Sequence, residues 1–345
     1  MTDAMRSKKS YAGGMAIETD YNTYVAPTTF MRYLKFGIDV NVTDEDLDVM
    51  DGVPGSKYMI RKQAEINGPL EIPAWPQEGL EPILKLIFGA ATSTQNIPST
   101  GLSYTHEFSQ SWSTLLSASL TRWVPGMSGE EDVEAYTGAV LSSLEIGYDG
   151  PGPISLKATW DCGGFSGAES APTRTYSTAV PFNWGGFVAE IDGTENTEIT
   201  KAAIKIERAT DKMFGADGAN GMVANILNPT DWLVTGSLAF PYRNKDELMT
   251  YLTGTTSGTA LATTITDRTL QLTTTGANIE TVYDYLLDFK MPKVNMSKCK
   301  VDKDADKTVM YDIDFAARYY SGTDAGLGTN KILSATVVSK LAAIT

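Results

Sequence analysis

The residue types that most often carry catalysis or bind transition metals are scarce in this chain. Histidine occurs once, at His106, and cysteine occurs twice, at Cys162 and Cys299. One histidine and two distant cysteines do not make a zinc site, and they do not supply a Ser-His-Asp or Cys-His apparatus. We therefore expect His106 to be structural or on the surface, and both cysteines to be reduced, buried apolar side chains.

Three aspartates near the C-terminus have the spacing that opens a calcium-binding loop. Asp302, Asp304 and Asp306 alternate with other residues, but Lys307 and Ile313 stand where an EF-hand loop has glycine and glutamate. We interpret this segment as the solvated tip of a β-hairpin and keep calcium binding as the alternative.

A second acidic cluster lies in the segment 43–55. Its apolar side chains favour a loop that docks on a partner while the carboxylates face water, and metal binding is the alternative. The contact residues expected there are Asp44, Glu45, Asp46, Leu47, Asp48, Val49, Met50 and Asp51.

Acidic and aromatic residues also allow two carbohydrate-related functions. A pair of carboxylates would serve a hydrolase, and exposed tryptophans would serve a carbohydrate-binding or adhesive β-sandwich on a surface. Large aromatic side chains are more often core or interface residues. The chain has no glycine-rich phosphate-binding motif, so we predict no cofactor and no enzyme site. The tryptophans are Trp75, Trp112, Trp123, Trp160, Trp184 and Trp232.

The charge balance argues against a protein that grips nucleic acid through its phosphates. The chain has 345 residues, a formal net charge of -14 and a pI near 4.6, whereas phosphate binding requires clustered lysine and arginine. An acidic surface repels DNA, which suits DNA that must slide past without sticking, although solubility alone would also explain it. We expect no membrane span, which would need about 18 apolar residues, and no signal peptide.

The elements that would position any site occur twice along the chain. Gly68-Pro-Leu-Glu-Ile-Pro73 and Gly236-Ser-Leu-Ala-Phe-Pro241 share the pattern Gly-x-Leu-x-apolar-Pro. The two glycines that begin the copies, Gly68 and Gly236, are 168 positions apart, about half of the chain. We therefore expect a duplicated strand-and-helix unit. A single core with a long β-rich insertion is the alternative.

Each copy continues into a short helix and a later hairpin. The helices are expected over 81–88 and 246–252, each followed by a glycine stop, and Asn244 is a candidate cap for the second. Turn residues predict hairpins over 140–160 and 294–319. The predicted fold is mainly β, with two tandem β-sandwich or barrel-like domains, each flanked by a short α-helix.

The same patterns divide the chain into five parts. We assign residues 1–29 to an N-terminal arm, 30–167 to a first domain, 168–198 to a linker, 199–322 to a second domain and 323–345 to a C-terminal arm.

This order of elements resembles the tail tube (major tail) proteins of long-tailed, non-contractile bacteriophages. The resemblance rests on the segment 68–73, the helix that ends at Gly89, and the phrase Tyr148-Asp-Gly-Pro-Gly-Pro-Ile-Ser-Leu-Lys-Ala-Thr159, and it extends over about residues 30 to 322. It implies a structural protein of the virion tail that is made in the host cytoplasm.

The resemblance also implies an assembly. Such proteins stack as rings whose inner sheets form a barrel around a lumen, and DNA passes through that lumen without specific binding. The simplest members carry one tube domain and form hexameric rings. Two copies per chain would make a six-fold-like ring from three chains, and a ring of six chains is the alternative.

Loops and arms join successive rings in these proteins. Residues 43–56 occupy the position of the ring-joining loop, and 211–221 occupy the corresponding place in the second copy. The further contact residues implied are Asp211, Met213, Phe214 and Asp217 in that second loop, and Tyr11, Tyr21 and Tyr24 in the N-terminal arm. The expected partners are copies of the chain and other tail proteins (tape measure, tail terminator and distal tail).

Overall fold

The computed structural model confirms a mainly β protein with two short α-helices. It describes residues 12–47, 58–98, 101–111, 114–125, 131–167, 169–170, 173–214, 225–264, 266–302, 309–324 and 328–344. The strands of the first half are β1 (Ala12–Ile17), β2 (Thr29–Met31), β3 (Lys35–Phe36), β4 (Asp39–Leu47), β5 (Tyr58–Pro73), β6 (Gly89–Gln95), β7 (Tyr104–Gln110), β8 (Ala118–Pro125), β9 (Glu131–Asp149), β10 (Ser155–Cys162) and β11 (Gly164–Ser166).

The second half adds the remaining strands. They are β12 (Phe187–Ile191), β13 (Thr194–Glu195), β14 (Lys201–Met213), β15 (Asn225–Pro241), β16 (Arg268–Glu280), β17 (Tyr283–Asp302), β18 (Met310–Ala317), β19 (Tyr320–Asp324), β20 (Gly328–Lys331) and β21 (Ser334–Ser339). The helical elements are α1 (Leu80–Phe88), the 3-10 turn η2 (Trp184–Gly186) and α2 (Asp246–Thr253). Both α-helices lie where the sequence predicts them.

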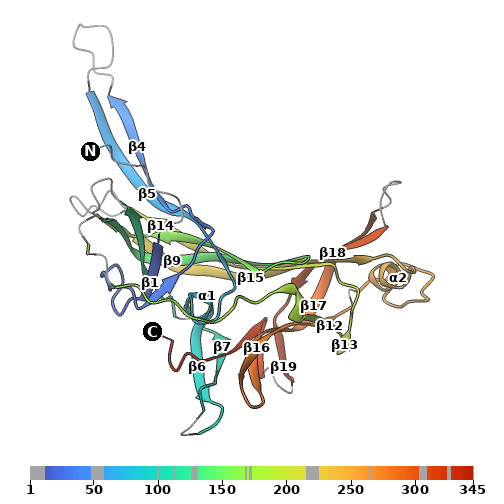
Figure 1. Cartoon of the computed structure of the whole chain (residues 1–345). Coiled ribbons are helices and arrows are strands. Elements are labelled where there is room, and N and C mark those ends of the chain that lie inside the picture. The colour runs from blue at the N-terminus through green and yellow to red at the C-terminus, as the bar shows by residue number, and fades with distance from the viewer. Residues whose placement is uncertain are drawn as a thin grey trace.

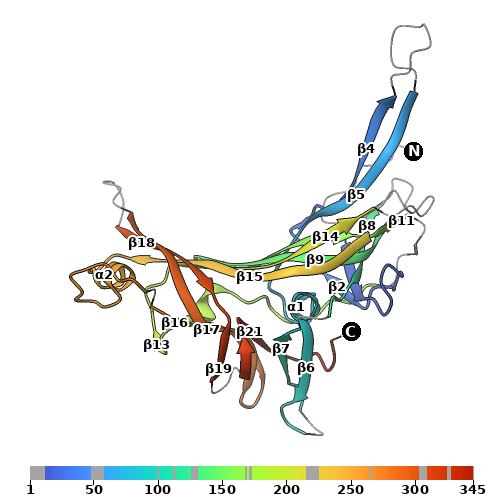
Figure 2. The same ribbon diagram turned by 180° about the vertical axis from the view of Figure 1, so that it is seen from behind.

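One long antiparallel sheet runs through the molecule. Its strands follow the order β4-β5-β10-β9-β14-β15-β18-β17. Figures 1 and 2 show this sheet from opposite sides, with α1 on its lower face and neither helix over its concave upper face. The sheet therefore has one face that packs on a core and one that stays open.

The two copies read from the sequence have the same pairing pattern in space. We call β3, β4, β5, α1, β9 and β10 the first unit, and β14, β15, α2, β17 and β18 the second unit. Both α-helices end at a glycine in the left-handed conformation, Gly89 with φ 86° and Gly254 with φ 77°. A side chain is strained there, so glycine sets the end of each helix.

A β-bulge recurs at the same place in both units. The pairing of β9 with β10 skips Ser142 between Thr159 and Trp160, and the pairing of β17 with β18 skips Ser297. A bulge changes the pairing of one strand by one residue, so its repetition fixes the correspondence between the units residue by residue.

The repeated glycine of the motif has a steric cause. A Cβ on Gly68 would lie 1.9 Å from the carbonyl oxygen of Gly37, and a Cβ on Gly236 would lie 2.3 Å from that of Ala203. Neighbouring backbone approaches both glycines too closely for any side chain. This explains why the motif begins with glycine in both copies.

The two units meet edge to edge rather than through separate cores. Strand β9 pairs with β14 from Asp149 opposite Lys201 to Ser143 opposite Glu207. Lys201 Nζ lies 3.4 Å from Asp149 Oδ2 across this joint. A single apolar cluster contains core residues of both units, so the sheet and the core continue from one unit into the next.

Helix α1 lies deep in this shared core, whereas α2 does not. Every residue of α1 except Lys85 is buried, and no residue of α2 is buried. Phe88 at the end of α1 packs on Trp232 of β15, with ring centroids 5.7 Å apart. The second unit therefore covers the helix of the first.

Three segments outside the two units are ordered by strand pairing. The N-terminal segment contains β1, in which Met15 is fully buried between β2 and β8. The C-terminal segment contains β21, which pairs with β7 and β17. The segment 187–191, expected in a linker, is β12 and pairs with β16. Tertiary pairing orders these segments because each covers an otherwise open strand.

Among the described residues, neither helix is long and apolar enough to cross a bilayer.

Candidate functional site

The histidine and the two cysteines are the residues best suited to catalysis or metal binding, and they lie on three different strands, β7, β10 and β17. His106 is fully buried on β7, and its Nδ1 lies 2.8 Å from the Ser93 hydroxyl. Burial lowers the pKa of His106, which favours the neutral imidazole. Cys162 is buried, Cys299 is partly buried, and burial raises the pKa of both thiols. These groups are structural, as the sequence predicts for His106.

Metal-binding geometry is not found in the described part of the chain. No group of three or more His, Cys, Asp or Glu side chains there is arranged to hold a metal ion. Of the three spaced aspartates, Asp302 ends β17, whereas Asp304 and Asp306 lie outside the described residues.

The tryptophans do not form a sugar-binding platform in the described structure. Trp123, Trp160 and Trp232 are buried, and Trp75 and Trp184 are partly buried. Trp112 lies outside the described residues. The buried rings serve the core instead, which is the usual place of large aromatic side chains.

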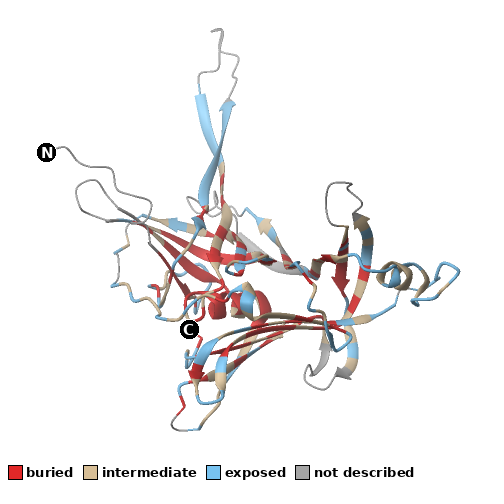
Figure 3. Cartoon of the chain, turned by 45° about the vertical axis from the view of Figure 1, so that its right-hand side comes forward, coloured by how far each residue is buried: buried red, intermediate tan, exposed pale blue. Residues whose placement is uncertain are grey.

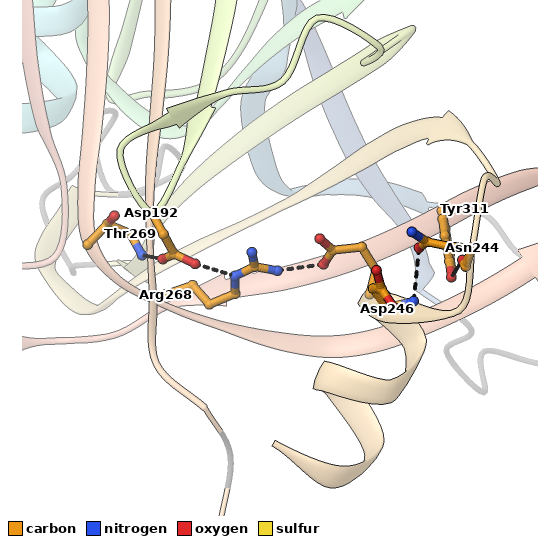
Figure 4. A network of polar contacts seen from close by, with 7 residues as sticks. Asp192, Asn244, Asp246, Arg268, Thr269 and Tyr311 are labelled. Atoms are coloured by element: carbon orange, nitrogen blue, oxygen red, sulfur yellow. Dashed lines mark hydrogen bonds and ion pairs between the residues drawn. The ribbon is translucent and has the colours of Figure 1, made fainter. Parts of the chain in front are cut away.

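A polar network ties the second helix to the sheet. Arg268 Nε donates to Asp192 Oδ2 at 2.8 Å, and Nη1 donates to Glu247 Oε2 at 2.5 Å (Figure 4). At the start of α2, the Asp246 amide donates to Asn244 Oδ1 at 3.0 Å. The N-cap itself is Lys245, whose side chain makes no capping hydrogen bond, so the prediction of Asn244 as the cap is wrong by one position. Arg268 thus bridges the carboxylates of Asp192 and Glu247, and the network holds α2 on β16.

The described part of the first predicted ring-joining loop, residues 43–47, belongs to a projecting hairpin. Asp44, Glu45, Asp46 and Leu47 lie in β4, which pairs with β5 as far as Leu47 opposite Tyr58. Figure 1 shows this hairpin extending well beyond the rest of the sheet, and Figure 3 colours it as exposed. Asp48, Val49, Met50 and Asp51 lie outside the described residues.

The hairpin carries charged and apolar groups together. Arg61 Nε lies 3.3 Å from Asp44 Oδ1, and Lys62 Nζ lies 3.1 Å from Glu45 Oε2. The adjacent Tyr58, Met59 and Ile60 are all exposed. We did not identify these three from the sequence as contact residues, although three successive apolar residues before Arg61-Lys62 are a signal for an apolar patch. An exposed row of this kind marks an interaction surface.

Of the second predicted loop, residues 211–221, the structure describes residues 211–214. Asp211 and Met213 lie in β14, paired with β15, and Phe214 follows directly. Met213 and Phe214 are exposed, and Asp217 lies outside the described residues. In the N-terminal segment, Tyr21 is exposed, Tyr24 is partly exposed and Tyr11 lies outside the described residues.

The open face of the long sheet is polar and mixed in charge. Along β14, Ile204 and Ile206 point into the core, while Lys205 and Glu207 alternate with them on the other face and contact each other. The same alternation places lysines and carboxylates side by side on the neighbouring strands. Charged residues of this face are Glu145, Asp149, Lys157, Lys201, Lys205, Glu207, Lys298, Lys300, Asp312 and Asp314.

Ion pairs join lysines and carboxylates on the described part of this face. Lys298 Nζ lies 3.0 Å from Asp314 Oδ2, and Lys201 Nζ lies 3.4 Å from Asp149 Oδ2. Phosphate binding relies on lysines and arginines that lack such partners.

Comparison with known proteins agrees with this architecture. The sequence profile of a family described as phage tail tube protein matches residues 12–317, nearly the whole chain. No individual curated protein sequence matches the chain. The profile covers both units and the joint between them, and the chain therefore belongs to the phage tail tube protein family.

Proposed function

We propose that this protein builds the phage tail tube as rings of three chains, each ring containing six tube units. The family is one of structural virion proteins. Rings of this kind stack into a hollow tube through which the phage DNA leaves the virion.

The observation that carries this proposal is the edge-to-edge joint between β9 and β14. Two like units share a continuous antiparallel sheet across it, which is how neighbouring units of a barrel would meet. Closing such a sheet removes exposed strand edges, and a closed ring is the outcome of a joint that repeats by rotation. Two units per chain make three chains the number that gives six units.

The open face of the sheet fits the wall of the lumen. Its lysines and carboxylates neutralise one another locally, as Lys205 and Glu207 do. Lysines that are paired with carboxylates hold phosphates weakly, so we expect DNA to pass through without specific binding. We assign the opposite, apolar face, which packs on α1, to the body of the ring.

The projecting β4–β5 hairpin fits a contact between successive rings. Its described strands extend beyond the body of the molecule (Figure 2) and carry exposed apolar and charged residues. Met213 and Phe214 offer a second, smaller apolar contact. At the ends of the tube, the same surfaces would meet other tail proteins.

Electron microscopy of the purified chain tests the proposal. We expect end-on averages of negatively stained particles to show six lobes around a stain-filled centre, and light scattering of single rings to give the mass of three chains. Side views would show stacked discs. Rings of six chains would contradict the proposed stoichiometry, and compact particles without a central hole, even after addition of preformed phage tails as seeds, would contradict the tube.

A further inference from the structure

The internal joint between the two units uses one strand edge of each unit. The matching edges of the two outermost strands of the long sheet, β4 and β17 beyond Val294, stay unpaired in the described structure. Strand β14 pairs with β15 on one side and with β9 on the other. Its counterpart in the first unit is β3–β4, which pairs only with β5 among the described residues. Beyond Val294, β17 pairs only with β18 in the described structure, whereas its counterpart β9 has β14 beside it.

The exposure of equivalent residues shows what the free β4 edge lacks. Ile206 pairs with Val234 as Val40 pairs with Ile66, so the two residues are equivalent. Ile206 is fully buried, but Val40 is 39% exposed. Two positions further, Val42 is 42% exposed, although its equivalent, Arg208, is fully buried. An exposed apolar side chain on an unpaired edge strand indicates a surface that pairs with another strand.

At the other end of the long sheet, an apolar residue of the second unit is exposed where its equivalent in the first unit is buried. Leu252 of α2 corresponds to Ile87 of α1, because Gly254 and Gly89 end the two helices. Ile87 is fully buried beside the second unit, but Leu252 is 37% exposed. The second unit thus lacks a neighbour where the first unit has one.

We propose that the β4 edge of one chain pairs with the β17 edge of a second copy in the register that β14 and β9 use within the chain. In that register Asp39 lies opposite Lys300 of the second copy, Val40 opposite its Cys299 and Asn41 opposite its Lys298. The partner is another copy of this chain, joined head to tail. The proposal depends on the proposed ring only for the number of chains that close it.

Charge supports this register. Within the chain, the equivalent pair is Lys205 opposite Glu145. Between chains it becomes Asp39 opposite Lys300, so the two signs are exchanged and the attraction is kept. Opposite charges placed across antiparallel strands stabilise the pairing, and like charges weaken it. A register shifted by one residue would turn the apolar side chain of Val40 towards the polar face.

The chain offers a direct test, because Cys299 is native. A Val40→Cys variant places two thiols opposite each other across the joint, within reach of a disulfide. Burial and Glu247 raise the pKa of Cys299 to about 11, so oxidation should be run at pH 9 with a copper–phenanthroline catalyst. We expect a ladder of disulfide-linked dimers and trimers on non-reducing gels. The Val40→Cys, Cys299→Ser double variant is the matched control and should give no ladder.

A second variant tests the register itself. Val42→Cys lies on the same face, two positions along, and should cross-link at least tenfold more slowly than Val40→Cys, since opposed Cα atoms must be within about 7 Å. Charge exchange gives an independent measurement. Asp39→Lys and Lys300→Asp should each weaken chain–chain association about tenfold, and the double variant should restore it.

The outcomes separate this joint from the proposed tube. Rings that form without the Val40–Cys299 cross-link, or that cross-link equally well at Val42, overturn the register and leave the tube intact. Cross-linked oligomers that never make hollow rings support the joint and contradict the tube. Protein that gives neither rings nor cross-links contradicts both.

Discussion

Arg208 of β14 donates from Nη1 to the carbonyl oxygen of Ile87, in the last turn of α1, at 3.4 Å. Its Nη2 donates to the carbonyl oxygens of Ser111 at 3.2 Å and Thr114 at 2.7 Å, and the guanidinium lies 5.5 Å from the centre of the Trp232 ring. The last carbonyls of a helix have no partner within it. An arginine of the second unit thus completes the helix end of the first.

Loss of this arginine should destabilise the whole chain. Arg208→Met keeps an apolar stem but leaves buried carbonyl oxygens without donors, each of which costs about 1–3 kcal/mol. We expect the unfolding free energy of the unassembled protein to fall by about 3 kcal/mol in urea titrations followed by tryptophan fluorescence. The control is Arg243→Met, an exposed arginine paired with Glu198, which should change it by about 0.5 kcal/mol or less. Equal effects of both variants would contradict the role of Arg208.

Adding one methyl group at the repeated glycine should also be costly. The Cβ of a Gly236→Ala variant would lie 2.3 Å from both the Ala203 carbonyl oxygen and the Phe315 ring. Overpacking of this kind costs about 1–3 kcal/mol, which should appear as a lower melting temperature in calorimetry. Gly152→Ala is the control, because a Cβ there meets nothing within 4 Å. A Gly236→Ala protein as stable as this control would show that β14 and β15 separate easily.

His106 should make the fold sensitive to mild acid. Burial lowers the pKa of His106 in the folded state, so below the unfolded value of about 6.5 the unfolded chain gains a proton that the folded chain does not. Stability is therefore present above this value and is lost as the pH falls towards the folded pKa. Urea titrations between pH 7.5 and 5.5 should show the loss in the native protein and a smaller one in His106→Gln.

Two buried carboxyls act with the opposite sign. Burial raises the pKa of Glu78 and Glu81, so their contribution is present at low pH and is lost as the pH rises through the folded values. Comparison of the native protein with His106→Gln at each pH cancels this trend. Identical pH profiles of the two proteins would refute the histidine effect.

Shortening the projecting hairpin should separate ring formation from stacking. Thr43 pairs with Gln63, so replacing residues 44–62 by Asn-Gly closes a two-residue turn at that pair. We expect rings of normal size and an unchanged melting temperature, because residues 44–46 and 58–62 of the removed segment are exposed, but no stacked tubes by electron microscopy. Tubes of native length from this variant would eliminate the hairpin as the contact between rings.

A milder change tests the apolar part of the same hairpin. Replacing Met59 and Ile60 together by serine keeps the hairpin length while removing exposed apolar surface. Tube length should fall at a fixed protein concentration, since burial of apolar area contributes about 25 cal/mol per Å². A matched Leu261→Ser variant changes an exposed apolar residue that follows α2 in the chain and should leave tube length unchanged.

Much of the fold was predictable because its signals are local. Gly89 and Gly254 stop helices through their own backbone conformation, and the alternation of Phe36, Ile38 and Val40 indicates a half-buried strand without reference to any partner. The structural class, both helices and the late hairpins follow from such signals. The single histidine and the two distant cysteines likewise argued, from the sequence alone, against a zinc site and a histidine-dependent catalytic triad.

The tertiary structure decided the features that depend on distant partners. Nothing near Lys205 in the sequence indicates that β14 lies beside β9, because strand pairing is chosen by contacts far along the chain. The segment from Asp44 to Leu47, which has three acidic residues, reads as a loop, yet it forms a strand because its pairing with β5 continues to Leu47. Local sequence therefore determined the repeated unit, and long-range pairing determined how two units share one sheet and which edges remain open.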